Sequence, residues 1–481
     1  MAKLLKKKLV FLLGSKIIIF LLFFILFFIS FYRLQFSPAT WYDEGLNAGI
    51  AKSLVEDGVY SLKVGPEEFV DERQFLITTN YPVILPVAIS LKIFGNSLTS
   101  ARLPMILYLF LFALMAYLLV CKWFGKKSAL MTLAFIVVFL PFYGNGKSVL
   151  GEVAGLFYLL AGLYIMDSKK LWKLFLSGIL LGLSVATKPF FILILPALFI
   201  GEIYNVIKNG FRKPSAYAIL IFAGLIPILF WFWTINPNFT LGNIGSALGY
   251  YSNSYADNTN IYQLVFSNIK RFVSETTPLH FAFMLVFSVW LIVGKIRKKE
   301  ALPTQIALVA FILLNFLWYL KTPGWYRYFF PAHLMLFLFF PASVIKIFSK
   351  RIAFAIIIFF IIVQSFMLVS KRNEPLYFSS EVQDFVLLVN INTTVNDSLL
   401  VVNSPSVAFL LDQRNVSQYV RINPELVFAP KYIKNHVDLI HDTYIVVGAL
   451  SEQDIEIRDL LANSYEKVED IGHQILYKRL E

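Results

Sequence analysis

Eleven apolar runs, each close to the length of a bilayer-spanning helix, constrain the fold of this chain more than any other feature. A spanning helix needs about 20 mainly apolar residues, and about 17 is the short end. Because only 15% of the 481 residues are charged, whereas a soluble domain carries about 25%, the sequence predicts an α-helical polytopic membrane protein. The runs are Leu9–Tyr32, Leu103–Val120, Ser128–Tyr143, Val149–Met166, Leu171–Ala186, Pro189–Ile207, Ala216–Thr234, Leu279–Gly294, Pro303–Leu320, Phe329–Ile345 and Ile352–Val369.

Basic residues between the runs predict the orientation in the membrane. Loops on the cytoplasmic side carry an excess of Lys and Arg, and here every second gap is basic. The basic gaps lie at Lys122–Lys127, Lys169–Lys173, Lys208–Lys213, Lys295–Lys299 and Lys346–Arg351. This alternation predicts a multi-pass protein of the cell membrane with a cytoplasmic N-terminus. Since these short clusters account for much of the net charge of +13, no nucleic-acid partner is predicted.

The apolar segment Tyr81–Phe94 does not fit this alternation. It is short and contains Pro82 and Pro86, and counting it as a span would invert every later gap. We therefore predict an interfacial or re-entrant helix that lies against the outer leaflet. The first outer loop then covers about 33–102, and a second long outer loop covers about 235–278.

The composition changes after the last run, which predicts two domains. Residues 1–370 would form the transmembrane domain, and residues 371–481 a soluble α/β domain outside the cell. Two apolar stretches of strand length in the tail are separated by helix-like patterns, and such alternation is typical of a layered α/β domain. The strand candidates are Leu399–Asn403 and Tyr444–Ala449, and the helix candidates are Glu381–Val389, Val407–Leu411 and Glu425–Asn435.

Two adjacent acids, Asp43 and Glu44, follow the first run and are preceded by Trp41 and Tyr42. Trp and Tyr anchor protein segments at the membrane–water interface, so the pair would lie at headgroup height. A carboxylate there can accept a proton from an attacking hydroxyl. The alternative is structural: acids at the start of an amphipathic surface helix, Glu44–Glu56, stabilised by the helix dipole.

A few charged residues mark the predicted outer ends of the runs. Arg102, Lys188 and Arg327 either extend to lipid headgroups or bind a phosphate-bearing lipid. Glu152 is either a dipole-stabilising acid at a helix start or a second functional carboxylate. Further candidates to line a site are Lys147, Tyr326 and Tyr328.

The sequence contains no firm metal-ligand spacing. His280 and His333 stand alone and are better explained as structural residues, and the single cysteine, Cys121, excludes a cysteine-based site. No cofactor is therefore predicted, although the outer carboxylates could bind a divalent cation.

Several motifs in a fixed order resemble the GT-C membrane glycosyltransferases. They are similar in particular to glycosyltransferase family 39, the protein O-mannosyltransferase and lipid A aminoarabinose transferase group. The resemblance covers about the first 350 residues. It is carried by W-Y-D-E-G-L-N-A-G-I-A-K-S-L from Trp41, T-T-N-Y-P-V-I-L-P from Thr78, S-A-R-L-P from Ser100, Thr187-Lys188-Pro189 and Y-R-Y-F-F-P from Tyr326.

The resemblance implies a sugar donor carried on a polyprenyl phosphate and used on the non-cytoplasmic face. Asp43 would then be the general base, with Glu44 beside it, and the acceptor hydroxyl would attack C1 with inversion. Lys188 and Arg327 would stabilise the leaving phosphate, and preorganised charge of this kind is often the largest catalytic contribution. Arg102 would join them at the donor phosphate. The helix Tyr81–Phe94 would lie where the lipid chain enters.

The sequence departs from its relatives in two places. The K-P-P motif of the aminoarabinose transferases is missing, and Thr79-Asn80-Tyr81-Pro82 stands in its place. The tail also lacks the β-trefoil-like insertion of eukaryotic protein mannosyltransferases. These departures argue for a bacterial or archaeal enzyme acting on neither lipid A nor a eukaryote-type protein substrate. The transferred sugar (hexose or pentose) and the acceptor (lipid, glycan or protein) stay open.

Two other classes of function compete with sugar transfer. A transporter or flippase for lipid-linked sugars would carry ionisable residues near the bilayer midplane on broken helices. Here the runs have few charges in their middles, and the distinctive acids lie in an outer loop. A glycan polymerase, or a receptor that binds its partner through the C-terminal domain, would not require the Asp43–Glu44 pair. Glycosyl transfer is the prediction that uses all of these features.

Overall fold

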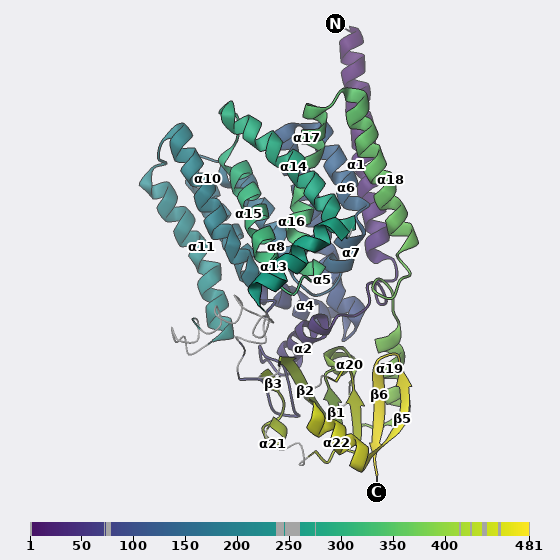
Figure 1. The fold of residues 1–481 in the computed structure, drawn as a ribbon. Coiled ribbons are helices and arrows are strands. Elements are labelled where there is room, and N and C mark those ends of the chain that lie inside the picture. Colours follow the sequence, from purple (N-terminus) through teal and green to yellow (C-terminus); the bar gives the residue numbers. More distant parts are fainter. Residues whose placement is uncertain are drawn as a thin grey trace.

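The computed structural model describes residues 2–71, 73, 78–236, 245, 260–274, 276–412, 415–423, 426–434, 440–450 and 454–480. A helical bundle forms one end of the molecule and a small sheet domain the other, and the N-terminus lies at the bundle end farthest from the domain (Figure 1). This architecture confirms the predicted fold class. The division between residues 370 and 371 stays a prediction; the last bundle helix, α18 (Lys350–Ser370), ends there.

All eleven predicted runs are helical in the structure. Two of them are bent pairs, by 65° between α6 and α7 and by 48° between α16 and α17. Both second helices begin with Pro141 or Pro341 in their first turn, and Pro cannot continue a preceding helix because it lacks the amide hydrogen. Besides α18, the helices formed by these runs are α1 (Ala2–Phe31), α5 (Leu98–Phe124), α6 (Lys126–Val137), α7 (Leu140–Gly146), α8 (Glu152–Met166), α9 (Leu171–Thr187), η1 (Pro189–Leu193), α10 (Ile194–Asn209), α11 (Pro214–Ile235), α14 (Thr276–Arg297), α15 (Pro303–Tyr319), α16 (Tyr326–Leu336) and α17 (Phe340–Ile347).

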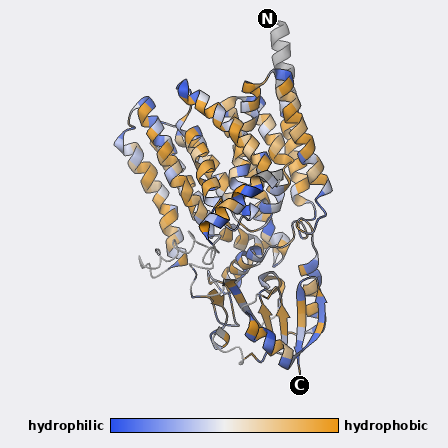
Figure 2. Ribbon diagram, viewed as in Figure 1, coloured by the Kyte–Doolittle hydropathy of each residue, from blue (hydrophilic) through white to orange (hydrophobic). Residues whose placement is uncertain are grey.

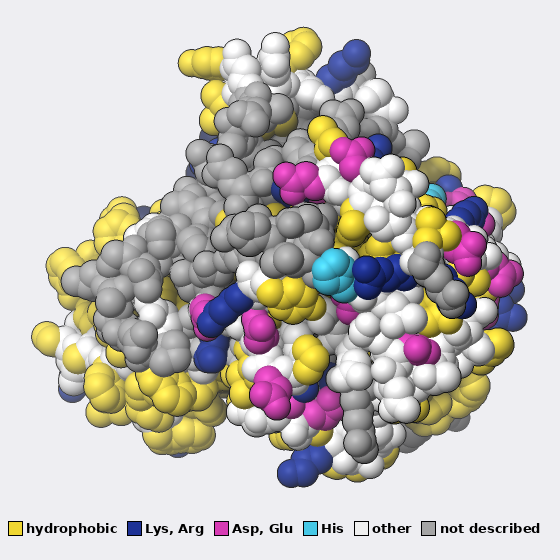
Figure 3. All heavy atoms as spheres, turned by 90° about the horizontal axis from the view of Figure 1, so that it is seen from below, with side chains coloured by type: hydrophobic (Ala, Val, Ile, Leu, Met, Phe, Trp, Pro, Cys, Tyr) yellow, Lys and Arg dark blue, Asp and Glu magenta, His cyan; other side chains and the backbone are white. Residues whose placement is uncertain are grey.

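The outside of the bundle is apolar, as a bilayer requires. By length and composition five helices in the described chain could cross a membrane, or seven if each bent pair is one span. Shorter apolar helices, including α8, α9 and α15, lie among them. Large hydrophobic side chains are exposed on α11 and α18, for example Phe222 and Phe366. Figure 2 shows the hydrophobic colour along the helices and hydrophilic residues near their ends. Seen from the domain end, hydrophobic side chains gather at the left and lower edge of the molecule (Figure 3). Exposed apolar surface of this kind indicates a membrane-facing surface.

The helix α4 (Tyr81–Phe94) lies at the domain end of the bundle, beside α2 (Tyr42–Glu56) (Figure 1). Its exposed residues Leu85, Ile89 and Ile93 follow one face at a spacing of four, while the opposite face is buried. This is the pattern of a helix with one face in the lipid and one in the protein.

The helix α2 is not the surface helix that the structural alternative assumed. Glu44, Leu46, Ile50 and Ala51 are all buried, because α4 packs against one side and α20 (Pro405–Leu410) of the C-terminal domain against another. The contact with a distant part of the chain, and not the local pattern, decides this burial.

The C-terminal domain contains a six-stranded sheet with the order β3-β2-β1-β4-β6-β5. The central β1 (Leu399–Val402) pairs in parallel with β2 (Val416–Asn423) and β4 (Tyr444–Val447). The other pairs are antiparallel. The remaining elements are α19 (Glu381–Asn392), β3 (Leu426–Phe428), α21 (Lys431–Lys434), α22 (Ile455–Ser464), β5 (Tyr465–Ile471) and β6 (Gln474–Arg479).

One local prediction needs correction. The predicted helix over Glu425–Asn435 is strand β3 followed by the short helix α21 in its described part, because Phe428 pairs with Val420 of β2; its first and last residues lie outside the described chain. The predicted second outer loop, 235–278, contains the helix α13 (Ile261–Ser274). Most of the rest of that loop, 237–244 and 246–259, also lies outside the described residues.

The backbones of α2 and α20 approach each other closely at Gly45. A Cβ atom added there would lie 2.6 Å from Ser406 Oγ and 2.7 Å from the carbonyl carbon of Pro405. Seven residues later, Lys52 Nζ donates hydrogen bonds to Phe409 O at 3.1 Å and Leu411 O at 2.7 Å, at the end of α20. Gly45 therefore permits backbone-to-backbone packing between the two parts.

We expect Gly45→Ala to destabilise the protein by about 1–3 kcal/mol, the usual cost of overpacking, because the added methyl meets α20 backbone. Thermal unfolding of the purified protein measures this as a lower Tm. Gly294→Ala is the matched control, since nothing lies within 4 Å of its Cβ position and alanine favours a helix. Equal Tm shifts in the two variants would contradict the close contact.

Candidate active site

The first ion pair of the site joins Asp43, in the first turn of α2, to Arg327, in the first turn of α16. Arg327 Nη1 donates to Asp43 Oδ2 across 284 residues of sequence. The guanidinium lies 5.0 Å from the ring centre of Trp325 and 5.1 Å from that of Tyr328, within the range of cation–π attraction. The Asp43 side chain is 26% exposed, so the carboxylate is fixed yet accessible.

A second pair joins Lys188, which follows α9, to Glu152, the first residue of α8. The Lys188 Nζ to Glu152 Oε1 distance is 2.5 Å, and Nζ also donates to Leu150 O at 2.9 Å. Glu152 is close enough to Arg327 and Tyr328 to interact electrostatically with both. The two ion pairs are therefore neighbours, as a common phosphate site would require.

The third pair is completely buried. Arg102 of α5 donates from Nε and Nη2 to the two carboxylate oxygens of Glu44, at 2.8 and 2.6 Å. Arg102 Nη1 donates to Leu34 O at 2.8 Å, and Glu44 Oε1 also accepts the Val149 amide hydrogen at 3.2 Å. Neither side chain has exposed area. This pair fixes the start of α2, and so the position of Asp43.

The short segment before α8, Val149–Gly151, is hydrogen-bonded to the first outer loop. Asn47 Nδ2 donates to Val149 O at 2.6 Å, and Thr79 Oγ1 donates to Leu150 O at 3.0 Å. Gly151 has φ +87°, a left-handed conformation that glycine adopts without strain. The segment thus holds Glu152 against Lys188 while it contacts the first outer loop.

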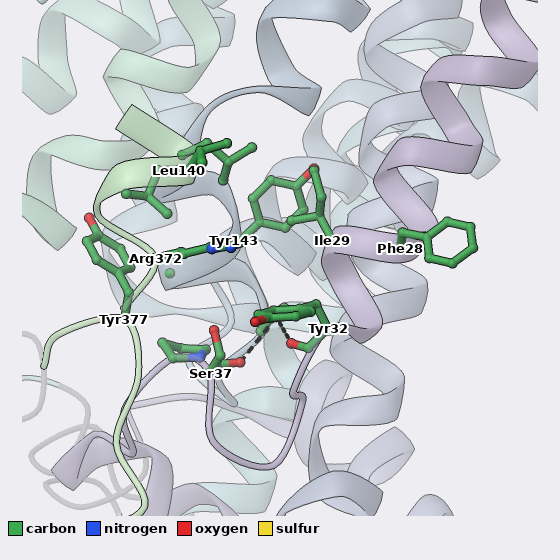
Figure 4. Close-up of a pocket in the computed structure, with 13 residues that line it drawn as sticks. Phe28, Ile29, Tyr32, Ser37, Leu140, Tyr143, Arg372 and Tyr377 are labelled. Carbon is green, nitrogen blue, oxygen red and sulfur yellow. Dashed lines mark hydrogen bonds between the residues drawn. The ribbon is translucent and has the colours of Figure 1, made fainter. Parts of the chain in front are cut away.

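Lys147 lines a pocket together with Tyr32 and Ser37. Its ammonium donates to Tyr32 O at 3.0 Å and Ser37 O at 3.2 Å. Burial, together with the nearby Arg102 charge, lowers the pKa of Lys147 to about 7. Figure 4 shows this pocket of about 240 Å³, with Phe28 and Ile29 on one side and Arg372 and Tyr377 on the other.

Asp43 and Arg327 open into a separate cavity of about 530 Å³. Five aromatic residues supply much of its wall, and Gly144 and Tyr377 are shared with the pocket of Figure 4. Burial, and then the charges of Asp43 and Asp454, raise the pKa of Tyr42 above its usual value, so this phenol stays protonated. The aromatic residues are Trp41, Tyr42, Trp325, Tyr326 and Tyr377.

The remaining candidates lie around Arg327. Tyr328 Oη accepts a hydrogen bond from Arg327 Nη2 at 3.3 Å. Tyr326 Oη lies 3.0 Å from His333 Nδ1, and His333 Nε2 lies 3.2 Å from His280 Nδ1. The two histidines that stand alone in the sequence are thus neighbours. Within the described residues, no group of three or more His, Cys, Asp or Glu is placed to hold a metal ion.

Sequence reasoning missed the residues that the C-terminal domain and its connector bring to the cavity. They are Leu376, Tyr377, Arg421 and Ile422. No local motif marks them, since their place in the cavity arises from the docking of the domain on α2. A lone arginine in a strand carries no signal of its own.

Comparison with known proteins supports the fold. Residues 83–233 match the family model described as dolichyl-phosphate-mannose-protein mannosyltransferase, and no curated protein sequence matches the chain. Crystal structures of ArnT from Cupriavidus metallidurans are similar over 96% of this chain and 98% of that one. The apo form has a TM-score of 0.63 at 12% identity, and the form bound to undecaprenyl phosphate has 0.61 at 11%.

A second solved protein has the same architecture over a shorter share of its own length. The oligosaccharyltransferase of Archaeoglobus fulgidus matches 90% of this chain and 68% of that one, with a TM-score of 0.53 at 13% identity. At such identities the likeness concerns the fold alone. Together with the family match over residues 83–233, it shows that the chain has the GT-C fold of these membrane proteins.

Proposed function

We propose that the chain transfers a sugar from a polyprenyl-phosphate donor to an acceptor hydroxyl, with inversion at C1 and with Asp43 as the general base. The observation that carries this proposal is the accessible Asp43 carboxylate in an aromatic cavity, paired with Arg327 and adjoining the Lys188–Glu152 pair. A base, two cations and a water-restricting wall are what such a transfer needs.

Asp43 accepts the proton of the acceptor hydroxyl while the oxygen attacks C1 of the sugar. The bond between C1 and the phosphate oxygen breaks, and the polyprenyl phosphate leaves with the electron pair.

Arg327 and Lys188 are the proposed ligands of the donor phosphate. Each is paired with a carboxylate, Asp43 for Arg327 and Glu152 for Lys188. A phosphate oxygen that draws Arg327 toward itself would release Asp43 to act as the base. Base activation would thus depend on a loaded donor.

Glu44 and Arg102 have a different role in this proposal from the one that the resemblance implied. Both are completely buried and bonded to each other, so we assign them the positioning of Asp43 rather than contact with the substrate. Lys147 likewise holds the loop at Tyr32 and Ser37. Tyr328 orients Arg327, and Tyr326 lines the cavity.

Two further observations support the donor class and the face of the membrane. An ArnT crystal structure with this fold contains undecaprenyl phosphate, and the exposed stripe of α4 offers an apolar surface beside the site. The alternation of basic gaps supports a site on the non-cytoplasmic face. The cell membrane is accordingly the proposed location.

The direct test incubates the purified protein with polyprenyl-phosphate hexoses and pentoses, together with lipid, glycan and peptide acceptors, and measures release of the polyprenyl phosphate. In this assay we expect Lys188→Met to raise the KM for the donor about 10- to 100-fold, because a charged hydrogen bond contributes about 1.5–3 kcal/mol. The acceptor KM should not change.

The matched control is Lys122→Met, which removes a lysine paired with Asp167 at the surface and should leave both constants unchanged. The double variant Lys188→Met/Glu152→Gln avoids an unpaired buried carboxylate and should show the same donor effect. An unchanged donor KM in both Lys188 variants would remove Lys188 from the phosphate site. Failure of the wild type to consume any of these donors would contradict the function itself.

A further inference from the structure

The C-terminal domain supplies one wall of the catalytic cavity. Arg421 and Ile422 of β2 line the same cavity as Asp43. Tyr42, the neighbour of Asp43, donates from its hydroxyl to Arg421 O at 3.4 Å, across 379 residues of sequence. The cavity is therefore complete only when the domain is docked on α2.

The Arg421 side chain is held in place by a network inside the domain. Its Nε donates to Asp454 Oδ1 at 2.6 Å, and its Nη2 donates to Tyr419 Oη at 2.7 Å. Asn403 Nδ2 donates to the other Asp454 oxygen at 3.3 Å, and Asn403 Oδ1 accepts the Arg421 amide hydrogen at 2.8 Å. Since Asp454 is completely buried while the Arg421 side chain keeps 15% exposure, the guanidinium is oriented at the surface of the cavity.

The position of this network in the sheet is also significant. The parallel strands β1, β2 and β4 run in one direction, and Asn403 and Gly448 directly follow β1 and β4. Arg421 lies on β2 two residues beyond Tyr419, the partner of the last β1 residue. Open α/β sheets bind ligands outside the carboxyl ends of their parallel strands. The edge of the sheet at which such domains bind ligands, formed by the carboxyl ends of β1, β2 and β4, therefore lies on the side of Asp43.

The chemistry of the wall indicates the class of ligand. Among the described residues that line the cavity, the charged ones are Asp43, Arg327 and Arg421. Arg421 is paired with Asp454 as Arg327 is with Asp43. Flat aromatic faces and oriented hydrogen-bond donors suit a neutral ring that carries hydroxyl groups.

We infer that the acceptor is a carbohydrate, and that Arg421 binds its hydroxyl groups on the side of the cavity opposite the donor phosphate. This inference rests on the proposed function and assigns the acceptor class for that same site. Arg327 then serves the donor, Arg421 determines acceptor specificity, and Asp454 is a positioning residue for Arg421. Ile422 adds an apolar contact beside it.

The test measures binding without transfer. Purified full-length protein in nanodiscs, without donor, is titrated with a panel of neutral trisaccharides, with glycerol 3-phosphate and with a Ser/Thr-containing peptide. We expect binding of at least one trisaccharide. Arg421→Gln/Asp454→Asn should weaken it about 10-fold, the effect of losing about one hydrogen bond that is not replaced. The double change avoids leaving a buried carboxylate unpaired.

Two further variants separate binding from folding. Arg421→Lys keeps a cation opposite Asp454 but lacks the planar guanidinium with its several N–H donors. This variant should therefore retain the wild-type Tm but bind the trisaccharide more weakly. The control, Arg479→Gln, changes an exposed arginine of β6 in the same domain and should bind like the wild type. Wild-type binding of a trisaccharide by the double variant overturns the inference. Binding of the phosphate or peptide probe alone, or of no probe, also overturns it.

The transfer assay distinguishes failure of this inference from failure of the proposed function. If the donor is consumed while Arg421 changes leave trisaccharide binding intact, only the acceptor assignment is wrong. If Arg421-dependent trisaccharide binding occurs but no polyprenyl-phosphate sugar is consumed, the proposed transfer is wrong and the carbohydrate site stands.

Discussion

Replacing Asp43 with Asn should lower kcat for sugar transfer by about 100- to 10,000-fold, the usual contribution of a positioned general base. The amide has nearly the same shape and can still accept a hydrogen bond from Arg327, but it cannot take the acceptor proton. Because the donor contacts are assigned to Lys188 and Arg327, donor binding should change little. Steady-state kinetics with a polyprenyl-phosphate sugar, together with donor binding in the absence of acceptor, measure both effects.

The matched control for this change is Asp57→Asn at the opposite end of α2. Asp57 pairs with Lys63 near the surface, at 2.9 Å, and lies outside the cavity residues. We expect near wild-type kcat in that variant and a cooperative unfolding transition in both, which shows that both are folded. Transfer at the wild-type rate by Asp43→Asn would remove Asp43 from the reaction, whatever the remaining residues do.

Replacing Arg102 with Met should destabilise the protein by about 3–5 kcal/mol, because it leaves the Glu44 carboxylate buried without its partner. Glu44 has no exposed area and receives two hydrogen bonds from Arg102. The loss should free the start of α2 and with it Asp43, so transfer should fall together with stability. Thermal and denaturant unfolding of the purified variant measure the first effect.

Two companion variants test whether the unpaired charge is the cause. Glu44→Gln/Arg102→Met removes both charges and should recover most of the lost stability, since a buried pair contributes little net energy compared with neutral residues of similar volume. Lys122→Met breaks the surface pair with Asp167 and should cost about 0–1 kcal/mol. Wild-type stability of Arg102→Met would mean that Glu44 is not buried as the structure has it.

Much of the fold was predictable because the bilayer imposes strict local requirements. Each predicted run coincides with a helix or a bent pair of helices; Ser128–Tyr143, for example, is divided at Val138–Phe139, just before Pro141. The strands Leu399–Val402 and Tyr444–Val447 also lie where the apolar stretches indicated. The prediction failed at Leu426–Phe428, where pairing with a neighbouring strand outweighed the local helical pattern.

The candidate site was only partly predictable. Charged residues near the ends of the runs are unusual enough to be noticed one at a time, which is how Asp43, Lys188 and Arg327 were found. Their grouping into separate ion pairs was not predicted, and neither was the complete burial of Glu44 and Arg102. Arg421 was not predicted at all, because no sequence feature near it distinguishes a cavity residue from an ordinary surface cation.

The sequence by itself therefore determined the class of fold and the residue types available for chemistry. In a bilayer every backbone polar group needs an internal partner, so a run of apolar residues has few alternatives to a helix. The charged residues at the ends of such a run can be recognised from the sequence alone. The tertiary structure alone decided which charges meet, across 58 residues for Glu44 and Arg102 and 284 for Asp43 and Arg327. Those partners are set by how the helices and the domain pack. Packing brings together distant segments, and no local sequence feature of one segment shows which other segment it will contact.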